Sequence, residues 1–541
     1  MRNKKKMLAL LLSATMLAFA CTGCKKEEPN AGKTEGVPAD TIVYALDTSP
    51  SGDFFPYGMR TAADTNVYSL VYASLLTSDG SGEYEPYLAD RYEISDDELT
   101  YTFYLNENAV WSDGEPVTAN DVAFSFMVTA DPENEQLYAT MAQTIAGVAE
   151  YQAGTADTIS GINIIDDHTI SFTTTSVSAS SLSYFGLLSI LPEHIWEGNG
   201  YRSLDEYTGE EMTYVIGCGP YSITEFEEGS YTKFEANEDF FLGTPVTKNI
   251  YFQVLNDSTA SSELSAGTVD IAPISSLSDA ELTDLESKGF TSTSFAEDSY
   301  NVLFFTQGNT YPTEFRQAIA YALDRQSMVD TLMDGRGTVC NMLMTPASWA
   351  YPSDGNFISY DEATAKEKLE EAGYKDTNGD GYVENPDGSE LTLRFAYPTG
   401  IAVREQSAVV IQENLKSIGL NVELMGGDFN TISAYIMDGA CDIYMMGISN
   451  DTPDPDCSMW AATVGTVDED FATLCMAASA TTDQNERKEI YKDAAEQLAQ
   501  SAALIPLYCM DSTFVYPETL ENYNPGTFNN FYEVYKWALY E

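Results

Sequence analysis

The segment between residues 82 and 134 has the clearest alternation of apolar and polar positions in the chain. Leu99–Leu105 (LTYTFYL) alternates in this way, which is the period of a strand with one buried face. Asp113-Gly114 predicts a turn after this strand. Thr118-x-x-Asp121 is a capping box, so a helix is expected to begin there. The apolar residues that this helix would bury are Val122, Phe124, Phe126 and Met127.

The alternation typical of strands and the spacing typical of helices predict further elements in the first half of the chain. Strands are expected at Thr41–Leu46, within Ile159–Thr173, and at Tyr221–Phe226, Tyr231–Ala236 and Val269–Ala272. Helices are expected at Asn66–Ser74 and Ser258–Gly267, the second of which ends at its glycine.

From about Tyr300 the pattern changes to repeated units of helix, glycine and strand. Helices are expected at Thr313–Met333 (with Thr313 as its cap), Glu362–Ala372 (capped by Asp361), Arg404–Ile418, Thr431–Met437 and Glu486–Ala499. Strands are expected at Leu391–Phe395, Leu420–Leu424, Asp442–Met446 and Ala502–Leu507. This alternation predicts an α/β lobe with a largely parallel sheet, and the last strand is expected to return the chain to the first lobe.

Several motifs resemble one protein family in their order and spacing. They are the strand–turn–helix unit described first, Gly217–Tyr221 (GCGPY) at the start of a hairpin, FRQAIAYALDR at Phe315–Arg325, and EEAGY followed by NGDG at Glu370–Gly381. In these features the chain resembles the family 5 solute-binding proteins, the peptide- and nickel-binding receptors of bacterial ABC importers. The resemblance extends from about Thr41 to the end of the chain.

The resemblance implies an α/β, two-lobed periplasmic-binding-protein-like fold of type II, enlarged by an extra subdomain, with the ligand cleft between the lobes. Lobe I would comprise residues 40–299 plus 499–541, with the inserted subdomain at about 60–205, and lobe II residues 300–498. Such a receptor closes around its ligand by a hinge and carries out no chemistry on it. We therefore expect no enzyme activity and no cofactor.

The N-terminus predicts a lipoprotein signal peptide over residues 1–23. Arg2 and the lysines at 4–6 precede an apolar stretch, Met7–Ala20, that is too short for a permanent membrane span. Cys24, in Thr-Gly-Cys, resembles the lipidated cysteine of a lipobox, and Cys21 is the alternative. Residues 24–39 are polar and rich in Gly, Pro, Lys and Glu, as expected of a flexible tether.

Charge excludes some classes of partner. The net charge of −58, from 84 acidic and 26 basic residues, argues against nucleic-acid binding, which needs a basic face. An acidic surface that keeps the protein soluble explains this charge, and steering of cationic ligands remains an alternative.

We expect a monomer on the outer face of the cytoplasmic membrane, held by its lipid alone.

The cysteines and histidines do not form a metal motif. Six cysteines follow the N-terminal pair without any CxxC spacing, and several of them lie in apolar runs such as Leu504–Met510, where they are expected to pack as small buried residues. The six are Cys218, Cys340, Cys441, Cys457, Cys475 and Cys509. The only histidines, His168 and His194, fall outside the expected cleft, so nickel or haem ligation by histidine has little support, and we expect no metal site of this kind.

The loop after the predicted strand Asp442–Met446 is the main candidate for ligand binding. It follows the carboxyl end of a strand, where α/β sheets present ligand-binding loops. In peptide-binding relatives this loop supplies an aspartate to the ligand's α-amine, and the matching residue is Asp451. Those relatives carry tryptophan three residues earlier, where this chain has Ile448. Helix capping by Asp451 or Asp454 is the structural alternative.

Three further residues are predicted to line the cleft. Arg404 matches the region in which dipeptide receptors hold an arginine for the ligand carboxylate, and a surface arginine is the alternative. Trp349 and Tyr351 follow Met344-Thr-Pro346 in an aromatic loop, where they either line the cleft or simply pack.

The segment Asp376–Asp387 has oxygen ligands at EF-hand spacing with glycine at the sixth position. It ends in Asp387 rather than Glu, and a strand follows it instead of a helix. A tight loop of Asx turns needs the same residues, so calcium binding and a turn both remain open.

The ligand expected from these features is a short peptide, delivered to an ABC permease and its ATPase. Ile448 and the 35 tyrosines favour an oligosaccharide or other solute instead, although five tryptophans limit sugar stacking. A sensor of peptide pheromones is a third hypothesis. A hydrolase would need a catalytic constellation that the sequence does not contain.

Overall fold

The first sheet of the computed structural model combines the beginning of the chain with a later hairpin. β1 (Thr41–Leu46) pairs in parallel with β10 (Asn249–Val254), which continues antiparallel into β9 (Tyr231–Ala236) and β8 (Tyr221–Glu227). The structure describes residues 38–57, 61–132, 141–196, 215–274, 277–306, 311–449 and 452–540. The predicted signal peptide, its tether and Cys24 lie outside these residues.

The second sheet is antiparallel and carries the capped helix that the sequence predicts. Its strands, in spatial order, are β4 (Ala89–Ile94), β5 (Thr100–Leu105), β7 (Thr169–Thr173) and β6 (Ile162–Asp166). The Asp121 carboxylate accepts from the Thr118 N–H at 2.8 Å, so the predicted capping box is confirmed at the start of α2 (Ala119–Ala130). Phe126 of α2 is fully buried and its ring centroid lies 4.4 Å from that of Phe172 on β7.

Short elements complete this part of the chain. They are α1 (Ala62–Val71), β2 (Leu76–Ser78), β3 (Tyr84–Pro86), α4 (Val148–Gln152), α5 (Ser181–Leu187), α6 (Glu193–Trp196), α7 (Asp257–Ala266), β11 (Ala272–Pro273) and α8 (Asp279–Glu286). After the last long strand come β19 (Leu520–Glu521), the 3-10 helix η3 (Val534–Lys536) and β20 (Ala538–Leu539). As predicted, α7 ends at Gly267, whose left-handed φ of 70° suits glycine.

The third sheet is mixed, so the expectation of a largely parallel sheet is wrong. Its order is β11-β18-β13-β17-β15-β16, and β12 and β14 also pair with β18. Only β15 (Leu393–Pro398) pairs in parallel, with β16 (Val422–Gly427) and β17 (Ile443–Ser449). The helix–glycine–strand units therefore build only this part of the sheet, and β13 (Ser299–Phe305) runs antiparallel to both of its neighbours.

The helices associated with this sheet are α9 (Thr313–Ala322), α10 (Arg325–Leu332), α11 (Glu362–Glu371), α12 (Ala402–Ser417), α13 (Phe429–Met437), α14 (Ser458–Val464), α15 (Glu469–Ser479) and α16 (Gln484–Ser501). The single helix expected at Thr313–Met333 is in fact two. Asp324 accepts from the Ser327 N–H at 3.0 Å and caps a new helix, α10, while Pro312, not Thr313, is the N-cap of α9. Asp361 caps α11 as predicted.

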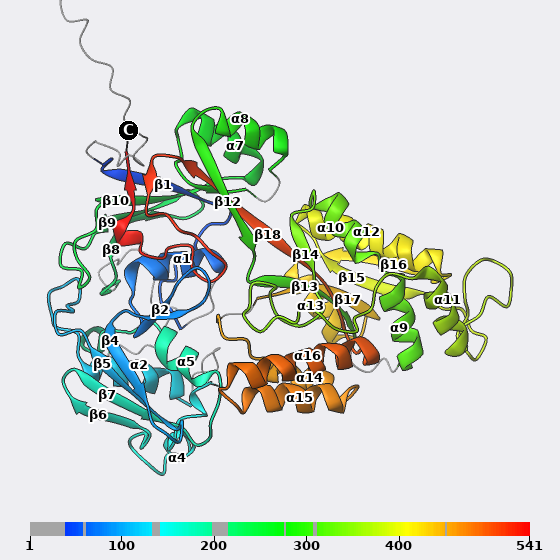
Figure 1. The fold of residues 1–541 in the computed structure, drawn as a ribbon, viewed down its shortest axis with the longest axis horizontal. Coiled ribbons are helices and arrows are strands. Elements are labelled where there is room, and N and C mark those ends of the chain that lie inside the picture. Colours follow the sequence, from blue (N-terminus) through cyan, green and yellow to red (C-terminus); the bar gives the residue numbers. More distant parts are fainter. Residues whose placement is uncertain are drawn as a thin grey trace, which may run out of the picture. The chain divides into compact units, whose positions relative to one another are not determined.

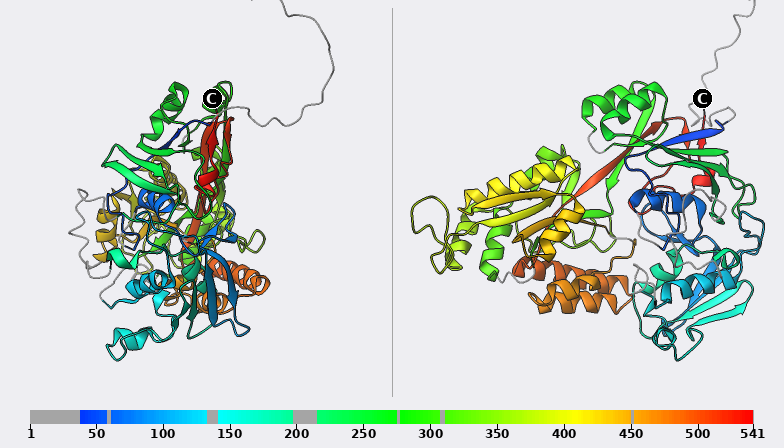
Figure 2. Two further views of the ribbon diagram at one scale, coloured as in Figure 1. Left: turned by 90° about the vertical axis from the view of Figure 1, so that its left-hand side faces the viewer. Right: turned by 180° about the vertical axis from the view of Figure 1, so that it is seen from behind.

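β18 (Ile505–Pro517) is much longer than the strand expected at Ala502–Leu507. Its first half pairs with β13 and with β14 (Gly337–Val339), and its second half pairs with β12 (Phe290–Ala296) and β11. Figures 1 and 2 show it as one long diagonal strand between these two groups of elements. Separate apolar cores lie on either side of this changeover, one led by aromatic residues such as Phe103 and Phe172, the other by residues such as Phe395 and Ile411.

Among the described residues, no helix combines the length and the apolar character needed to span a membrane.

Candidate functional site

Three residues on neighbouring strands of the third sheet, Asn301, Tyr508 and Gly447, lie side by side where an apolar face of the sheet ends. Asn301 on β13 lies opposite Tyr508 on β18 and opposite Gly447 on β17. Two positions further along the same strands, Leu303 and Met445 are paired and belong to the apolar core. The sheet face therefore changes from apolar to polar at Asn301.

Arg404, on α12, lies against Asn301 and Gly447 of this row. Its Nε donates a hydrogen bond of 2.9 Å to Oδ1 of Asn301, and a Cβ atom added to Gly447 would lie 2.2 Å from its Nη2. One turn along α12, the Ser407 hydroxyl is 2.8 Å from that of Tyr508. Arg404 is partly buried, with its Nε turned to Asn301, and it keeps some exposure to solvent. Burial lowers the pKa of Arg404, and the charges of Tyr508 and Glu297 oppose this only in part.

Glu297 joins this polar region at the connection between β12 and β13. Its carboxylate accepts from the Ser299 hydroxyl at 2.9 Å and from the Ser512 hydroxyl at 3.3 Å. Its N–H donates to the Met510 carbonyl at 2.9 Å, which ties it to the middle of β18. Burial raises the pKa of Glu297, and Ser299 and Arg404 offset this only in part.

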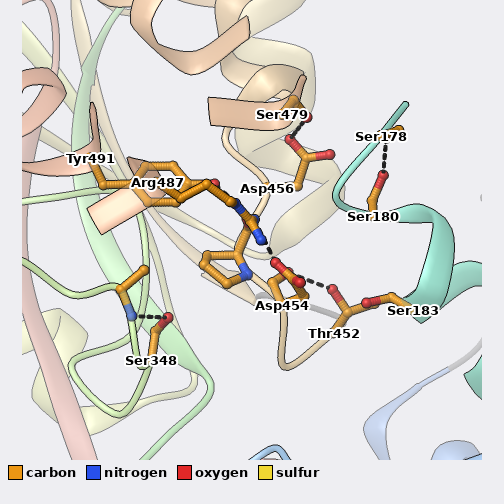
Figure 3. Close-up of polar contacts among 12 residues, drawn as sticks. Ser178, Ser180, Ser183, Ser348, Thr452, Asp454, Asp456, Ser479, Arg487 and Tyr491 are labelled. Carbon is orange, nitrogen blue, oxygen red and sulfur yellow. Dashed lines mark hydrogen bonds and ion pairs between the residues drawn. The ribbon is translucent and has the colours of Figure 1, made fainter. Parts of the chain in front are cut away.

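The loop after β17 is fixed by a buried arginine (Figure 3). Asp451 itself lies outside the described residues. Nη2 of Arg487, on α16, is 2.5 Å from the Asp454 carboxylate and donates to the Pro455 carbonyl at 2.6 Å. The Tyr491 hydroxyl donates to the same carbonyl at 2.6 Å. These contacts tie residues 454 and 455 to α16.

The alternative that Asp454 caps the next helix is wrong, because its carboxylate pairs with Arg487. Asp456 serves the start of α14 instead, accepting from the Ser458 N–H at 2.8 Å. Asp456 also accepts from the Ser479 hydroxyl at 2.8 Å, which links this loop to the end of α15.

The two predicted aromatic residues have different surroundings. The Trp349 ring centroid lies 5.1 Å from Cζ of Arg487, a cation–π contact beside the 454–456 loop. The Tyr351 hydroxyl accepts from the Asn341 N–H at 3.0 Å and donates to the Val339 carbonyl at 3.2 Å. Trp349 is thus brought to the loop, whereas the hydroxyl of Tyr351 is used to hold its own segment.

Residues from the first part of the chain also reach this loop. Tyr84, on β3, shares a hydrogen bond with the Ser183 hydroxyl of α5 and interacts with Asp454. Burial, followed by the Asp454 charge, raises the pKa of Tyr84 above its ordinary range. Nearby, the Ala179 N–H donates to the Ser479 carbonyl at 2.9 Å. The loop therefore lies where elements from both halves of the chain meet.

Sequence reasoning missed several of these residues. Glu297, Asn301, Gly447 and Arg487 gave no local motif, because their partners are distant in the chain. The sequence does contain one signal, and it concerns Arg487. This residue lies four positions before Tyr491 on α16, so it shares the helix face that carries the buried residues.

The structure brings together part of the possible calcium-ligand set in the loop at Asp376–Asp387. Carboxylate oxygens of Asp376, Asp380 and Glu384 lie within 4.8 Å of one another, while Asp387 accepts from Ser389 instead. Asp376 accepts from the N–H groups of two loop glycines, at 2.6 and 3.0 Å. These internal bonds favour the tight-turn alternative, and a calorimetric titration with calcium would test it.

Burial was expected for several of the six cysteines, and the structure extends it to all six, each with a free thiol.

Comparisons with known proteins agree with this architecture. Residues 83–469 match the family model described as bacterial extracellular solute-binding proteins, family 5 Middle. Oligopeptide-binding protein AppA of Bacillus subtilis is 26% identical, over 98% of each chain. Di/tripeptide-binding protein 1 of Pseudomonas aeruginosa is 25% identical, over 92% of this chain and 94% of the relative.

Solved structures share the α/β, two-lobed fold. AppA from Bacillus subtilis, in complex with a nonapeptide, is similar with a TM-score of 0.76 and 24% identity, over 94% of this chain and all of that one. NikA from Brucella suis, in complex with Fe(III)-EDTA, has a TM-score of 0.77 at 19% identity, over 92% of this chain and 99% of that one. The family match spans well over half of the sequence, and the chain belongs to the bacterial extracellular solute-binding proteins of family 5, which are binding proteins rather than enzymes.

Proposed function

We propose that this protein is the receptor of an ABC importer, and that it captures short peptides and delivers them to a membrane permease and its ATPase. The observation that carries the proposal is Arg404, whose Nε is fixed by Asn301. Its two terminal nitrogens have no hydrogen-bond partner among the residues that the structure describes. Such a fork suits the carboxylate of a peptide. Relatives that match over almost their whole length, and are named for oligopeptides and di- or tripeptides, support this ligand class.

In this proposal each end of the peptide has its own partner. Arg404 receives the carboxylate, Asp451 receives the α-ammonium group, and Trp349 and Tyr351 line the cleft between them. Residues 454 and 455, which follow Asp451 in the sequence, are bonded to Arg487 and Tyr491 of α16, and this supports a ligand-binding role for the segment after β17. Ile448 in place of tryptophan implies weaker stacking on the peptide near its amino end.

The direct test is native mass spectrometry of the purified protein, to identify the ligand that co-purifies. Short peptides are the expected finding. An oligosaccharide or a metal chelate in their place would refute the peptide assignment while leaving the solute-binding family membership intact.

Asp451 can be tested by substitution. Losing one partner of a desolvated charge pair costs roughly 2–5 kcal/mol, so Asp451→Ala should weaken binding of a tripeptide about thirtyfold or more. Asp451→Asn keeps the shape and should lose less, and N-acetylation of the peptide should weaken binding to the wild type. If Asp451 were only a helix cap, Asn would be nearly harmless and tripeptide affinity would survive both changes.

Capture would occur by rotation of lobe II, predicted at residues 300–498, against lobe I, predicted at residues 40–299 plus 499–541 with its inserted subdomain at about 60–205. Because α16 continues to Ser501 and the first half of β18 pairs with β13 and β14, the second crossing between the lobes is proposed near Met510 instead of at residue 499. Two strand connections support a hinge, at Glu297 between β12 and β13 and near Met510 in β18, because strand pairing changes at both. Small-angle scattering should show a smaller radius of gyration once a co-purified ligand is restored to stripped protein. An unchanged profile at saturation would contradict hinge closure.

The receptor is proposed to be a monomer, anchored to the outer face of the cytoplasmic membrane by a lipid on Cys24. Cys24→Ala should then abolish lipid labelling and release the protein into the medium. Labelling that persists in this variant and disappears in Cys21→Ala would move the anchor to Cys21. Sedimentation of the unanchored protein tests the monomer.

A further inference from the structure

The connection between α15 and α16 is joined to the antiparallel second sheet by a side-chain hydrogen bond. The Thr482 hydroxyl, in this connection, donates to the Glu98 carboxylate at 2.8 Å, although the two residues are 384 positions apart in the chain. Glu98 lies between β4 and β5, and Thr482 is exposed. The hydrogen bond therefore joins the predicted inserted subdomain to the predicted lobe II.

A second contact joins the end of α15 to the segment before α5. The Ala179 N–H donates to the Ser479 carbonyl at 2.9 Å. The Ser479 hydroxyl in turn donates to the Asp456 carboxylate at 2.8 Å, as Figure 3 shows. The segment before α5 is thereby connected, through Ser479, to the loop that follows β17.

Tyr84, on β3, reaches the same loop from the first part of the chain. Its hydroxyl shares a hydrogen bond with Ser183 of α5 and interacts with both the backbone and the charge of Asp454. Asp454 is itself paired with Arg487 of α16 at 2.5 Å. Tyr84 and Arg487 therefore hold this loop from the two predicted lobes.

Gly82, in the turn between β2 and β3, shows how closely the two surfaces meet. Its φ of 95° lies in the left-handed region that favours glycine. A Cβ at this position would lie 2.8 Å from Cβ of Pro453, and Cδ2 of Phe528 would be equally close. A side chain has no room here, so the turn packs directly against the loop after β17.

These contacts lie away from the strand connections proposed as the hinge. Figures 1 and 2 show α5 beside α14, α15 and α16, whereas β12 and the adjoining part of β18 lie away from this meeting place in both figures. Rotation about the strand connections would separate the contacts and leave the connections intact. The contacts therefore stabilise the closed arrangement alone, and one hydrogen bond typically shifts such an equilibrium by about 2- to 10-fold.

We propose that these contacts form an interlobe latch, which stabilises the closed arrangement without touching the ligand. Tyr84 is also a positioning residue, because it holds the loop that continues from Asp451 only while the lobes are together. Apparent affinity rises with the populated fraction of the binding-competent arrangement, so the latch sets how tightly and for how long a ligand is retained. This inference rests on the proposed capture of a peptide by hinge closure and adds the contact that completes closure. The members of the latch are Tyr84, Glu98 and Ala179 on one side, and Asp454, Ser479 and Thr482 on the other.

A cross-link tests whether the latch forms in solution. Glu98→Cys and Thr482→Cys are combined in the otherwise unchanged chain, in which the six cysteines of the folded unit are buried. Diamide is added, and mass spectrometry of the alkylated protein measures the disulfide. The pair should form a disulfide, and an equimolar mixture of tripeptides should accelerate its formation. Glu98→Cys combined with Lys366→Cys, on α11, is the control pair and should form none.

Substitutions test what the latch contributes to binding. Thr482→Val removes the hydroxyl that bonds to Glu98, so the tripeptide mixture should bind about 2- to 10-fold more weakly and dissociate faster by a similar factor. Thr482→Ser keeps the hydroxyl and should restore wild-type affinity. Thr473→Val is the matched control, because the Thr473 hydroxyl bonds to the Glu469 carbonyl within α15. Tyr84→Phe should act in the same direction as Thr482→Val.

A second probe distinguishes the latch from a contact with the ligand. N-acetylated tripeptides should lose affinity in Thr482→Val by the same factor as tripeptides with a free amine, since the latch acts on closure alone. Calorimetry measures both affinities, and stopped-flow displacement measures the dissociation rates. A factor that differs between the two probes would place Thr482 in contact with the ligand and would overturn the latch.

The remaining outcomes separate this inference from the proposed function. If Glu98→Cys with Thr482→Cys forms no disulfide, with or without tripeptides, the latch is refuted. A wild-type dissociation rate in Thr482→Val refutes it as well and leaves peptide capture standing. If the wild type binds no tripeptide, the peptide assignment fails, while the cross-link still decides whether the latch exists.

Discussion

The ion pair between Asp454 and Arg487 allows the effect of one substitution to be worked out from the structure. Arg487 is 2% exposed and Asp454 is 17% exposed, with 2.5 Å between Nη2 and Oδ1. Burial lowers the pKa of Arg487, but the hydrogen bond and charge of Asp454 outweigh burial, so the pKa is raised. Asp454→Asn keeps the shape of the side chain and removes the counter-charge from an arginine that cannot reach water.

The expected loss is large because the remaining charge is the more buried one. Leaving one member of a buried pair uncompensated costs about 3–5 kcal/mol of unfolding free energy. Arg487→Met removes the cation instead and leaves Asp454, which is partly exposed, so about 2–3 kcal/mol is expected. Replacing both residues should cost about 1–3 kcal/mol less than the sum, since the pair is directly coupled.

Urea denaturation followed by far-ultraviolet circular dichroism measures these differences. A matched control is Glu362→Gln, which breaks the pair between Glu362 and Lys366 on α11, whose side chains are 40% and 51% exposed. That change should cost less than about 0.5 kcal/mol. A loss below about 1 kcal/mol for Asp454→Asn, or strict additivity in the double variant, would refute the reasoning, because the pair would then be no more coupled than one at the surface.

Three further predictions concern other buried groups. Burial raises the folded-state pKa of Glu297 above its ordinary value of 4.5. Protonated Glu297 therefore contributes its full stability below the ordinary value, and this contribution is lost as the pH rises through the folded-state pKa. Glu297→Gln should therefore unfold at a higher temperature than the wild type at about pH 7 and similarly at about pH 4, and the opposite order would contradict a raised pKa. The carboxylate of Asp64 is fully buried and accepts hydrogen bonds from Ser51 and Thr61 at 2.7–3.1 Å. Asp64→Ala should therefore lower the free energy of unfolding, measured by urea titration, by about 2–4 kcal/mol. A loss below about 1 kcal/mol would contradict this. The six cysteines of the folded unit are buried and free, so a thiol reagent should label six more groups after denaturation than before, and dithiothreitol should leave the melting temperature unchanged.

Elements with a local chemical signal were predictable from the sequence. The capping box at Thr118, the cap at Asp361 and the glycine that ends α7 each act within a few residues, so the sequence alone contains the whole interaction. The break between α9 and α10 shows the limit of this reasoning. The spacing of apolar residues on both sides of Asp324 predicts one continuous helix, although the Asp324 carboxylate caps a second helix.

The candidate site was only partly predictable, because its geometry depends on sheet register. The resemblance to dipeptide receptors implies Arg404, but its partner Asn301 is 103 residues away and lies on β13, which pairs with β17. Gly447 looks like an ordinary strand glycine until Arg404 lies against it. No property of these residues in isolation indicates that they meet.

The strand expected at Ala502–Leu507 is too short, and the reason lies in the way β18 passes from one apolar core to the other. The expected strand ends at Leu507, although the apolar run continues to Met510 and is interrupted only at Asp511 and Ser512. The strand continues in the structure, and its partners change from β14 to β12 at this interruption. Glu297 is bonded to the backbone of Met510 and to the side chain of Ser512 at the same place. The polar residues therefore do not end the strand but mark where it leaves one apolar core for the other, which is where a rotation between the two lobes would disturb the fewest buried contacts.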